Sequence, residues 1–131
     1  MATPHVFRLR VYYEDTDLAG VVYYANHLRF IERARTEWAR EAGIDQGRLR
    51  AEEGLVFAVR RLEADYLAPA RFDDLLEVRT MPESATGARL ALLQEIRRGE
   101  ERLFAARVVL VAMDLGGRPR RIPARLTVSR G

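Results

Sequence analysis

The sequence predicts an α+β fold in which an antiparallel β-sheet wraps around one long central helix. One segment near the N-terminus repeats its apolar residues with the period of an amphipathic helix, and most of the remaining chain consists of consecutive strand-like segments. No second helical segment of similar length is available for the crossovers of a parallel sheet. With 131 residues the chain is long enough for one core and short for two, so residues 1–131 are expected to form a single domain.

The predicted elements follow in order. Alternating side chains predict a strand at 6–13, and apolar residues three and four positions apart predict the helix at 24–42, with Gly43 as its C-cap and Trp38 in the core. A polar, turn-prone stretch comes next. The later strands are expected at residues 54–68, 74–81, 89–97 and 102–114, with turns at 82–87 and at Gly99. One helix leaves part of the sheet uncovered, which favours a homo-oligomer.

Composition and charge exclude several classes of protein. No apolar run reaches the roughly 18 to 20 residues of a membrane span, and the N-terminus lacks the apolar core of a signal peptide, so a cytoplasmic location is expected. The absence of cysteine excludes a disulfide framework and a thiolate nucleophile. The net charge is +3, but all 22 basic residues are arginines that alternate with acids, so nucleic acid is not an expected partner.

The segment YYEDTDLAGVVYYAN, residues 12–26, places three carboxylates within four positions and follows them with an apolar and aromatic run. Carboxylates that repel one another beside an apolar wall are costly, and such clusters often mark a functional site. Asp15, Asp17 and Gly20 match three positions of an EF-hand calcium loop, but two essential ligands of that loop are missing. With only two histidines and no cysteine, zinc is not favoured either, and no metal is expected.

Two other hydrolytic arrangements are also disfavoured. Asp15 and Asp17 lie two residues apart on one segment, so they would sit side by side rather than across a sugar as in a glycosidase. Ser84 and Ser129 are the only serines, and neither lies in a G-x-S-x-G motif. What remains is acyl transfer to water by one carboxylate, provided that another group polarises the carbonyl.

The start of the predicted helix can supply that second group. The first N–H groups of a helix lack partners, so backbone amides around Val22 to Tyr24 could bind a developing oxyanion. Gly20 permits a tight turn between the acids and these amides. The apolar Val21, Val22 and Tyr23 would exclude water and strengthen each charge at the site.

Residues 12–38, YYEDTDLAGVVYYANHLRFIERARTEW, resemble the acidic signature and following helix of the hot-dog-fold acyl-CoA thioesterases. The likeness is to the branch that contains 4-hydroxybenzoyl-CoA thioesterase and the Tol-Pal-associated YbgC thioesterases, and it continues through VFAVRRLEADYLAPARFDDLLEV to the final PRRIP. This resemblance implies hydrolysis of an acyl-CoA thioester to a free acid and CoA. No cofactor is implied, because coenzyme A is part of the substrate. The resemblance also implies homodimers, often joined into tetramers, with active sites between subunits.

By the same resemblance, Asp17 would be the catalytic nucleophile or general base, and the backbone N–H of Tyr24 would polarise the thioester carbonyl. Gly20, Val21, Val22 and Tyr23 would line the substrate site. Related proteins carry a histidine at the position of Tyr24, and their usual tyrosine at the end of Y-A-N-Y is His27 here. His27 is therefore either a helper in proton transfer or a structural residue.

Arginines are the natural ligands for the phosphates of coenzyme A, because the guanidinium presents a planar fork to phosphate oxygens. The candidates are Arg60, Arg61, Arg71 and Arg89, together with Arg118, Arg120 and Arg121 on the last loop. Two alternatives remain for the function as a whole. The acyl group could be carried by an acyl carrier protein instead of CoA, or the chain could be a non-catalytic subunit that binds acyl thioesters or acts as a scaffold.

Overall fold

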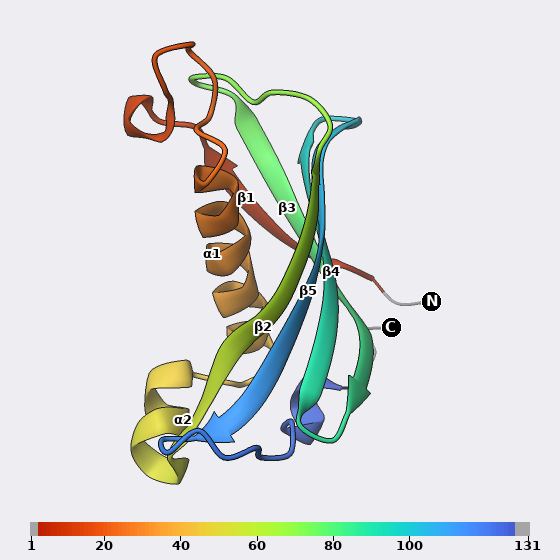
Figure 1. Ribbon diagram of the computed structural model, residues 1–131. Helices are drawn as coiled ribbons and strands as arrows, with labels where there is room; N and C mark the ends of the chain where they lie inside the picture. Colours follow the sequence, from red (N-terminus) through yellow and green to blue (C-terminus); the bar gives the residue numbers. More distant parts are fainter. Residues whose placement is uncertain (1–2, 128–131) are drawn as a thin grey trace.

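The computed structural model describes residues 3–127, in which five strands form one antiparallel sheet (Figure 1). The strands are β1 (His5–Arg10), β2 (Leu55–Tyr66), β3 (Leu75–Thr86), β4 (Arg89–Arg98) and β5 (Glu101–Asp114). Their order across the sheet is β1-β3-β4-β5-β2, and every neighbouring pair is antiparallel. Ser129 lies outside the described residues.

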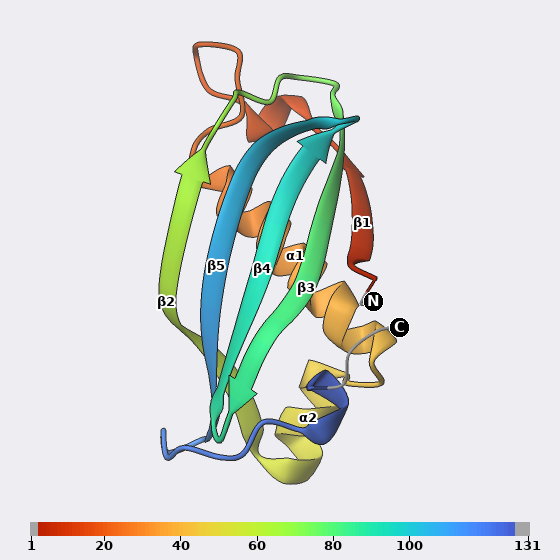
Figure 2. The ribbon, with the colours of Figure 1, turned by 90° about the vertical axis from the view of Figure 1, so that its right-hand side faces the viewer.

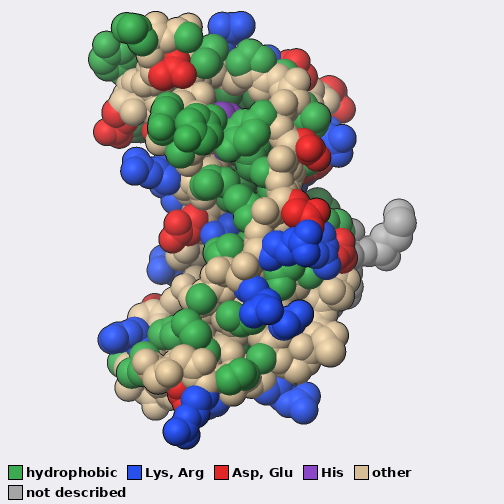
Figure 3. Space-filling view, viewed as in Figure 1, with side chains coloured by type: hydrophobic (Ala, Val, Ile, Leu, Met, Phe, Trp, Pro, Cys, Tyr) green, Lys and Arg blue, Asp and Glu red, His purple; other side chains and the backbone are tan. Residues whose placement is uncertain are grey.

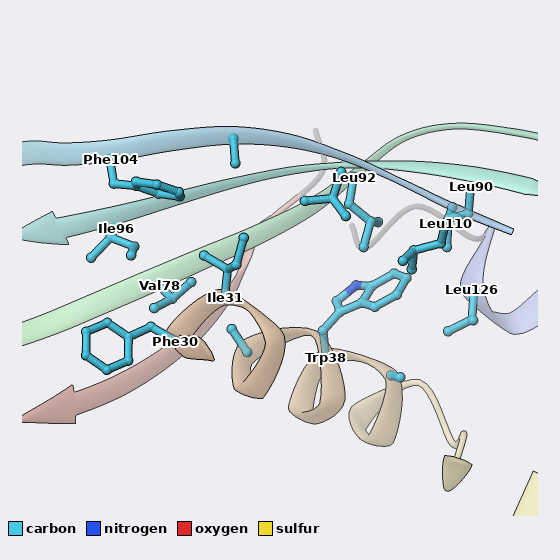
Figure 4. Close-up of a cluster of buried hydrophobic side chains, with 14 of the residues drawn as sticks. Phe30, Ile31, Trp38, Val78, Leu90, Leu92, Ile96, Phe104, Leu110 and Leu126 are labelled. Carbon is cyan, nitrogen blue, oxygen red and sulfur yellow. The ribbon is translucent and has the colours of Figure 1, made fainter. Parts of the chain in front are cut away.

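The long helix α1 (Asn26–Glu41) lies across one face of this sheet, as Figures 1 and 2 show from two directions. Its apolar residues recur at spacings of three and four, and Phe30, Ile31, Ala34 and Trp38 are buried between the helix and the sheet. In Figure 4 the side chains of Ile31 and Trp38 point from α1 toward core residues of the strands. The predictions of a long helix packed against the sheet and of a buried Trp38 are therefore confirmed.

A buried polar contact fixes α1 on the sheet. Gln94 of β4 is buried, and its Nε2 donates to the carbonyl oxygen of Ile31 and to Thr80 Oγ1, both at 2.9 Å. Arg35 Nη1 donates to Gln94 Oε1 at 3.0 Å. Because each buried polar group has a partner, this network sets the position of the helix without the cost of an unpaired amide.

Two predictions about local structure were wrong. The polar stretch after α1 contains a second helix, α2 (Gln46–Glu53), in which Asp45 Oδ1 accepts the Arg48 N–H at 3.0 Å and caps the N-terminus. Most of the predicted turn at 82–87 is instead the continuation of β3, which runs to Thr86, so that only Gly87 of this range lies in a turn. Proline is tolerated there because β1 pairs with β3 only up to Thr80, and a β-bulge follows Pro82.

The two edges of the sheet differ in length. The edge strand β1 has 6 residues, whereas β2 has 12 and exposes Val59, Leu62 and Tyr66. A long edge strand with exposed apolar side chains is a surface that another chain can pair with. Among residues 3–127, no helix has the length and apolar character needed to cross a membrane.

Candidate active site

The loop before α1 folds back on itself as a small hairpin of residues 16–22, which we call the acidic hairpin. Thr16 forms an antiparallel bridge with Val22. The Asp17 N–H donates to the Val21 carbonyl at 2.9 Å, and the Gly20 N–H donates to the Asp17 carbonyl at 3.0 Å. Gly20 has a φ of 80°, in the left-handed region that favours glycine. The predicted tight turn after the carboxylates is therefore present.

The carboxylate of Asp17 stands on this hairpin and is exposed in the single chain. Its Oδ1 accepts the Ala19 N–H at 2.9 Å, which fixes the side chain in a local turn. Within residues 3–127, no other hydrogen bond or ion pair reaches this carboxylate. Among residues 3–127, five cavities placed along the sheet and helices do not include Asp17 in their linings. One of its oxygens is thus available to an incoming group.

Asp15 has a different place from Asp17. Its side chain is buried, and its two oxygens accept the Asn26 Nδ2–H at 2.7 Å and the Tyr12 N–H at 2.8 Å. Its backbone carbonyl also accepts the Tyr23 N–H at 2.9 Å. The two aspartates therefore have separate roles: Asp15 joins the hairpin to the start of α1, and Asp17 remains open to solvent. Asn26, the first residue of α1, is a site residue that the sequence reasoning did not identify.

The backbone amides before α1 are not equivalent. The Val22 N–H donates to the Ala70 carbonyl at 2.8 Å, and the Tyr23 N–H donates to Asp15. The Tyr24 N–H has no hydrogen-bond partner among residues 3–127. Of the amides of Val22 to Tyr24, which were all expected to be free, only the Tyr24 N–H is free within the described residues. This N–H lies at the positive end of the α1 dipole, where a developing negative charge is stabilised.

Four aromatic rings, Tyr24, His27, Tyr66 and Phe104, pack together at the start of α1, and we call them the aromatic cluster. The His27 ring stacks on Phe104, with centroids 5.2 Å apart and planes 23° apart. The Tyr66 ring meets His27 edge-on at 5.0 Å and Phe104 edge-on at 5.0 Å. Figure 3 shows many hydrophobic side chains gathered on the upper part of the molecule, where α1 begins.

Two polar groups of this cluster meet at one carbonyl. Tyr66 Oη–H donates to the Tyr24 carbonyl oxygen at 2.8 Å, and His27 Nδ1 lies 3.0 Å from the same oxygen. Because a carbonyl oxygen only accepts, His27 Nδ1 carries the hydrogen, and Nε2 keeps a lone pair in the neutral ring. Burial lowers the pKa of His27, although the backbone carbonyls of Tyr24 and Tyr23 oppose this effect. His27 is therefore neutral at pH 7.

The sequence reasoning did not identify Tyr66 or Phe104. Both belong to the site because β2 and β5 pair in a register that places Tyr66 opposite Phe104. Within its own segment, Tyr66 shows only that it stands at the end of a predicted strand, shortly before Pro69. A long-range register of this kind has no local sequence signal.

The predicted phosphate-binding arginines lie in three places. Arg118, Arg120 and Arg121 are exposed on the chain after β5. Arg71 forms a bridge with Val21 beside the acidic hairpin. Arg60, Arg61 and Arg89 instead line a cavity of about 1130 Å³, which also contains Arg107. A β-bulge between Val59 and Arg61 inserts one extra residue into β2, so that two successive arginines line the same cavity. Within the described chain, neither Arg60 nor Arg89 forms an ion pair.

The antiparallel sheet packed around a long helix agrees with the class of hot-dog thioester hydrolases that the sequence resemblance implied. Comparison with known families gives the same class. The model of the thioesterase superfamily matches residues 19–105, beginning two residues after Asp17, and the chain belongs to this family.

Individual relatives extend the match over most of the chain. "Acyl-CoA thioester hydrolase YbgC" of Escherichia coli O6:H1 is 45% identical over 117 residues, which are 88% of this chain and 87% of that protein. "Acyl-CoA thioesterase YbgC" of Haemophilus influenzae is 44% identical over 110 residues, covering 84% and 81% of the two chains. A crystal structure of a probable thioesterase from Bartonella henselae superposes with a TM-score of 0.88 at 39% identity, covering 92% of this chain and 100% of the other.

Proposed function

We propose that this protein hydrolyses acyl-CoA thioesters to a free acid and CoA, with Asp17 as nucleophile or general base and the Tyr24 N–H as oxyanion donor. The observation that carries the proposal is the contrast among the amides of Val22, Tyr23 and Tyr24: within residues 3–127 the first two are paired and the third is open, as is the Ala25 N–H beside it. The names of the YbgC relatives, which describe acyl-CoA thioester hydrolases, support the acyl-CoA substrate class.

The chemistry needs few groups. Asp17, or a water molecule that gives its proton to Asp17, adds to the thioester carbon, and the electron pair of the C=O bond moves to oxygen. The Tyr24 N–H donates to this oxyanion, and a donor of this kind is worth about 3 to 4 kcal/mol in the barrier. Collapse of the intermediate breaks the C–S bond and releases the CoA thiolate, which needs no strong acid because the pKa of its thiol is low. Where Asp17 itself adds to the carbon, a water molecule then hydrolyses the resulting acyl–Asp17 anhydride, which releases the free acid and restores the carboxylate.

We expect a second copy of the chain to complete the site, because Asp17 is exposed in the single chain. The long edge of β2 offers unpaired backbone groups, and Leu18, Phe72 and Leu75 expose apolar side chains around the same end of the molecule. Burial of such side chains in a homodimer, or in a tetramer of two dimers, would also remove water from the site. Sedimentation measurements on the purified protein test this expectation.

The arginine cavity supports CoA as the carrier, in preference to an acyl carrier protein. Arg60 and Arg89 are free of ion pairs within the described chain, and Arg60, Arg61 and Arg89 line one cavity, as phosphate recognition requires. An acyl carrier protein lacks the nucleotide end of CoA. Arg71 lies beside the acidic hairpin and does not line this cavity. We place the phosphates of CoA at Arg60, Arg61 and Arg89.

The test is CoA release from a panel of short, long and aromatic acyl-CoAs by the wild type, Asp17→Asn and the control Glu14→Gln. The asparagine side chain of the first variant can still accept the Ala19 N–H, so the hairpin should persist while the charge is lost. We expect kcat to fall by at least about 100-fold for Asp17→Asn and to stay unchanged for Glu14→Gln, which alters an exposed carboxylate on the same loop. Wild-type turnover by Asp17→Asn would reject its role. No turnover of any thioester by the wild type would favour the non-catalytic alternative.

A further inference from the structure

Most of the backbone groups around the open Tyr24 N–H are hydrogen-bonded; within residues 3–127 the Ala25 N–H is the neighbouring exception. The preceding amides of Val22 and Tyr23 donate to Ala70 and Asp15, and the Tyr23 carbonyl accepts the Asn26 N–H at 2.8 Å. This last carbonyl belongs to the same peptide group as the Tyr24 N–H, so its hydrogen bond fixes the plane in which the N–H points. The remaining freedom is rotation of the next peptide group, between Tyr24 and Ala25, which contains the Tyr24 carbonyl.

That second peptide group is held by side chains. The Tyr24 carbonyl accepts one hydrogen bond from Tyr66 at 2.8 Å and one from His27 at 3.0 Å. Tyr66 is 42 residues away in sequence and stands on β2, so its hydroxyl ties the helix start to the sheet. His27 belongs to the first turn of α1, so the same carbonyl is also tied to the helix.

The two donors have little freedom of their own. His27 is buried and stacked on Phe104, and Tyr66 meets both of these rings edge-on. Aromatic pairs at these distances and angles are mutually attractive and resist rotation. A donor that is held before the substrate arrives needs no reorganisation during the reaction, which is the condition for strong oxyanion stabilisation.

We infer that Tyr66 and His27 are positioning residues, whose two hydrogen bonds to the Tyr24 carbonyl hold the Tyr24 N–H in the direction that the oxyanion requires. The inference rests on the proposed function of Tyr24. Neither side chain needs to touch the substrate for this role. The inference also gives His27 a task other than proton transfer, since its Nδ1–H is committed to the backbone.

The central test is Tyr66→Phe, which removes one hydroxyl and keeps the ring in the aromatic cluster. Its matched control is Tyr13→Phe, because Tyr13 is exposed and its hydroxyl has no hydrogen bond within residues 3–127. A shift of about 1 Å in a reacting group can cost about 100-fold in rate. For the loss of one of two restraints we expect kcat to fall about 10-fold, with KM within about twofold of the wild type and an unchanged melting temperature.

A second pair of variants tests His27. An asparagine at position 27 can place an N–H near the former Nδ1, whereas a leucine cannot donate, so His27→Asn should retain more of kcat than His27→Leu. Equal losses in these two variants would overturn the role of the His27 hydrogen bond. Equal kinetics for Tyr66→Phe and Tyr13→Phe, or a raised KM with unchanged kcat in Tyr66→Phe, would overturn the role of Tyr66.

The same assay separates this inference from the proposed function. If Asp17→Asn loses activity and Tyr66→Phe does not, the hydrolytic mechanism stands and the positioning role is wrong. If Asp17→Asn keeps wild-type activity, the proposed mechanism fails regardless of the result for Tyr66.

Discussion

Replacement of Asp15 by alanine should destabilise the protein, whereas replacement of Asp17 by asparagine should not. The Asp15 carboxylate accepts two hydrogen bonds, one from the buried Asn26 side chain and one from the Tyr12 N–H. A hydrogen bond to a charged group contributes about 1.5 to 3 kcal/mol to the free energy of unfolding, and this contribution is lost in full when the buried donor is left without an acceptor. The Tyr12 residue is exposed, so water can replace its lost partner. We therefore expect the free energy of unfolding to fall by about 3 kcal/mol.

A loss of this size should lower the melting temperature by about 10 °C for a chain of this length. Thermal and urea unfolding, followed by circular dichroism at one fixed protein concentration, measure it without interference from subunit dissociation. Glu14→Ala is the matched control, because Glu14 is an exposed acid in the same short turn. A double-mutant cycle with Asn26→Ala should give a coupling energy of about 1 to 2 kcal/mol. If Asp15→Ala and Glu14→Ala differ by less than about 0.5 kcal/mol, the structural role of Asp15 is refuted.

Two further predictions concern pH and the arginine cavity. Burial holds the pKa of His27 below its ordinary value of 6.5 in the folded state, so on acidification the unfolded chain takes up a proton first, and the free energy of unfolding should fall as the pH drops below about 6.5. In urea unfolding between pH 7.5 and 5, this free energy should fall less for His27→Phe than for the wild type. An equal dependence on pH in the two proteins would contradict the prediction. Joint replacement of Arg60 and Arg89 by alanine should raise KM for an acyl-CoA about 10-fold and leave KM unchanged for the corresponding acyl-pantetheine, which lacks the nucleotide phosphates. An equal rise in KM for both substrates would show that these arginines do not bind the phosphates.

Local patterns in the sequence were enough to predict the main elements of the fold. The helical spacing around Phe30, Ala34 and Trp38 identified α1, and alternation identified the strands. Helix α2 gave no comparable signal, because Leu49 is its only buried residue. The extension of β3 past Pro82 was equally hidden, since it depends on where the neighbouring strand β1 stops pairing.

The same division applies to the candidate site. The turn at Gly20 follows from local chemistry, and the structure contains it. The distinct places of Asp15 and Asp17 could not be predicted, because they depend on which carboxylate reaches Asn26 across the folded loop. Tyr66 and Phe104 join the site only through the pairing of β2 with β5. The catalytic role of Asp17 stays a prediction until the Asp17→Asn variant is measured.

The hydrogen bond between the Tyr66 hydroxyl and the Tyr24 carbonyl has a consequence for how the chain folds. The two residues are 42 positions apart in sequence, and Tyr66 reaches its place only when β2 has paired with β5. Closing a long loop takes longer than forming a helix, so α1 forms before the Tyr66 hydroxyl can donate its hydrogen bond to the Tyr24 carbonyl. A newly made chain therefore acquires this hydrogen bond only after β2 has paired with β5.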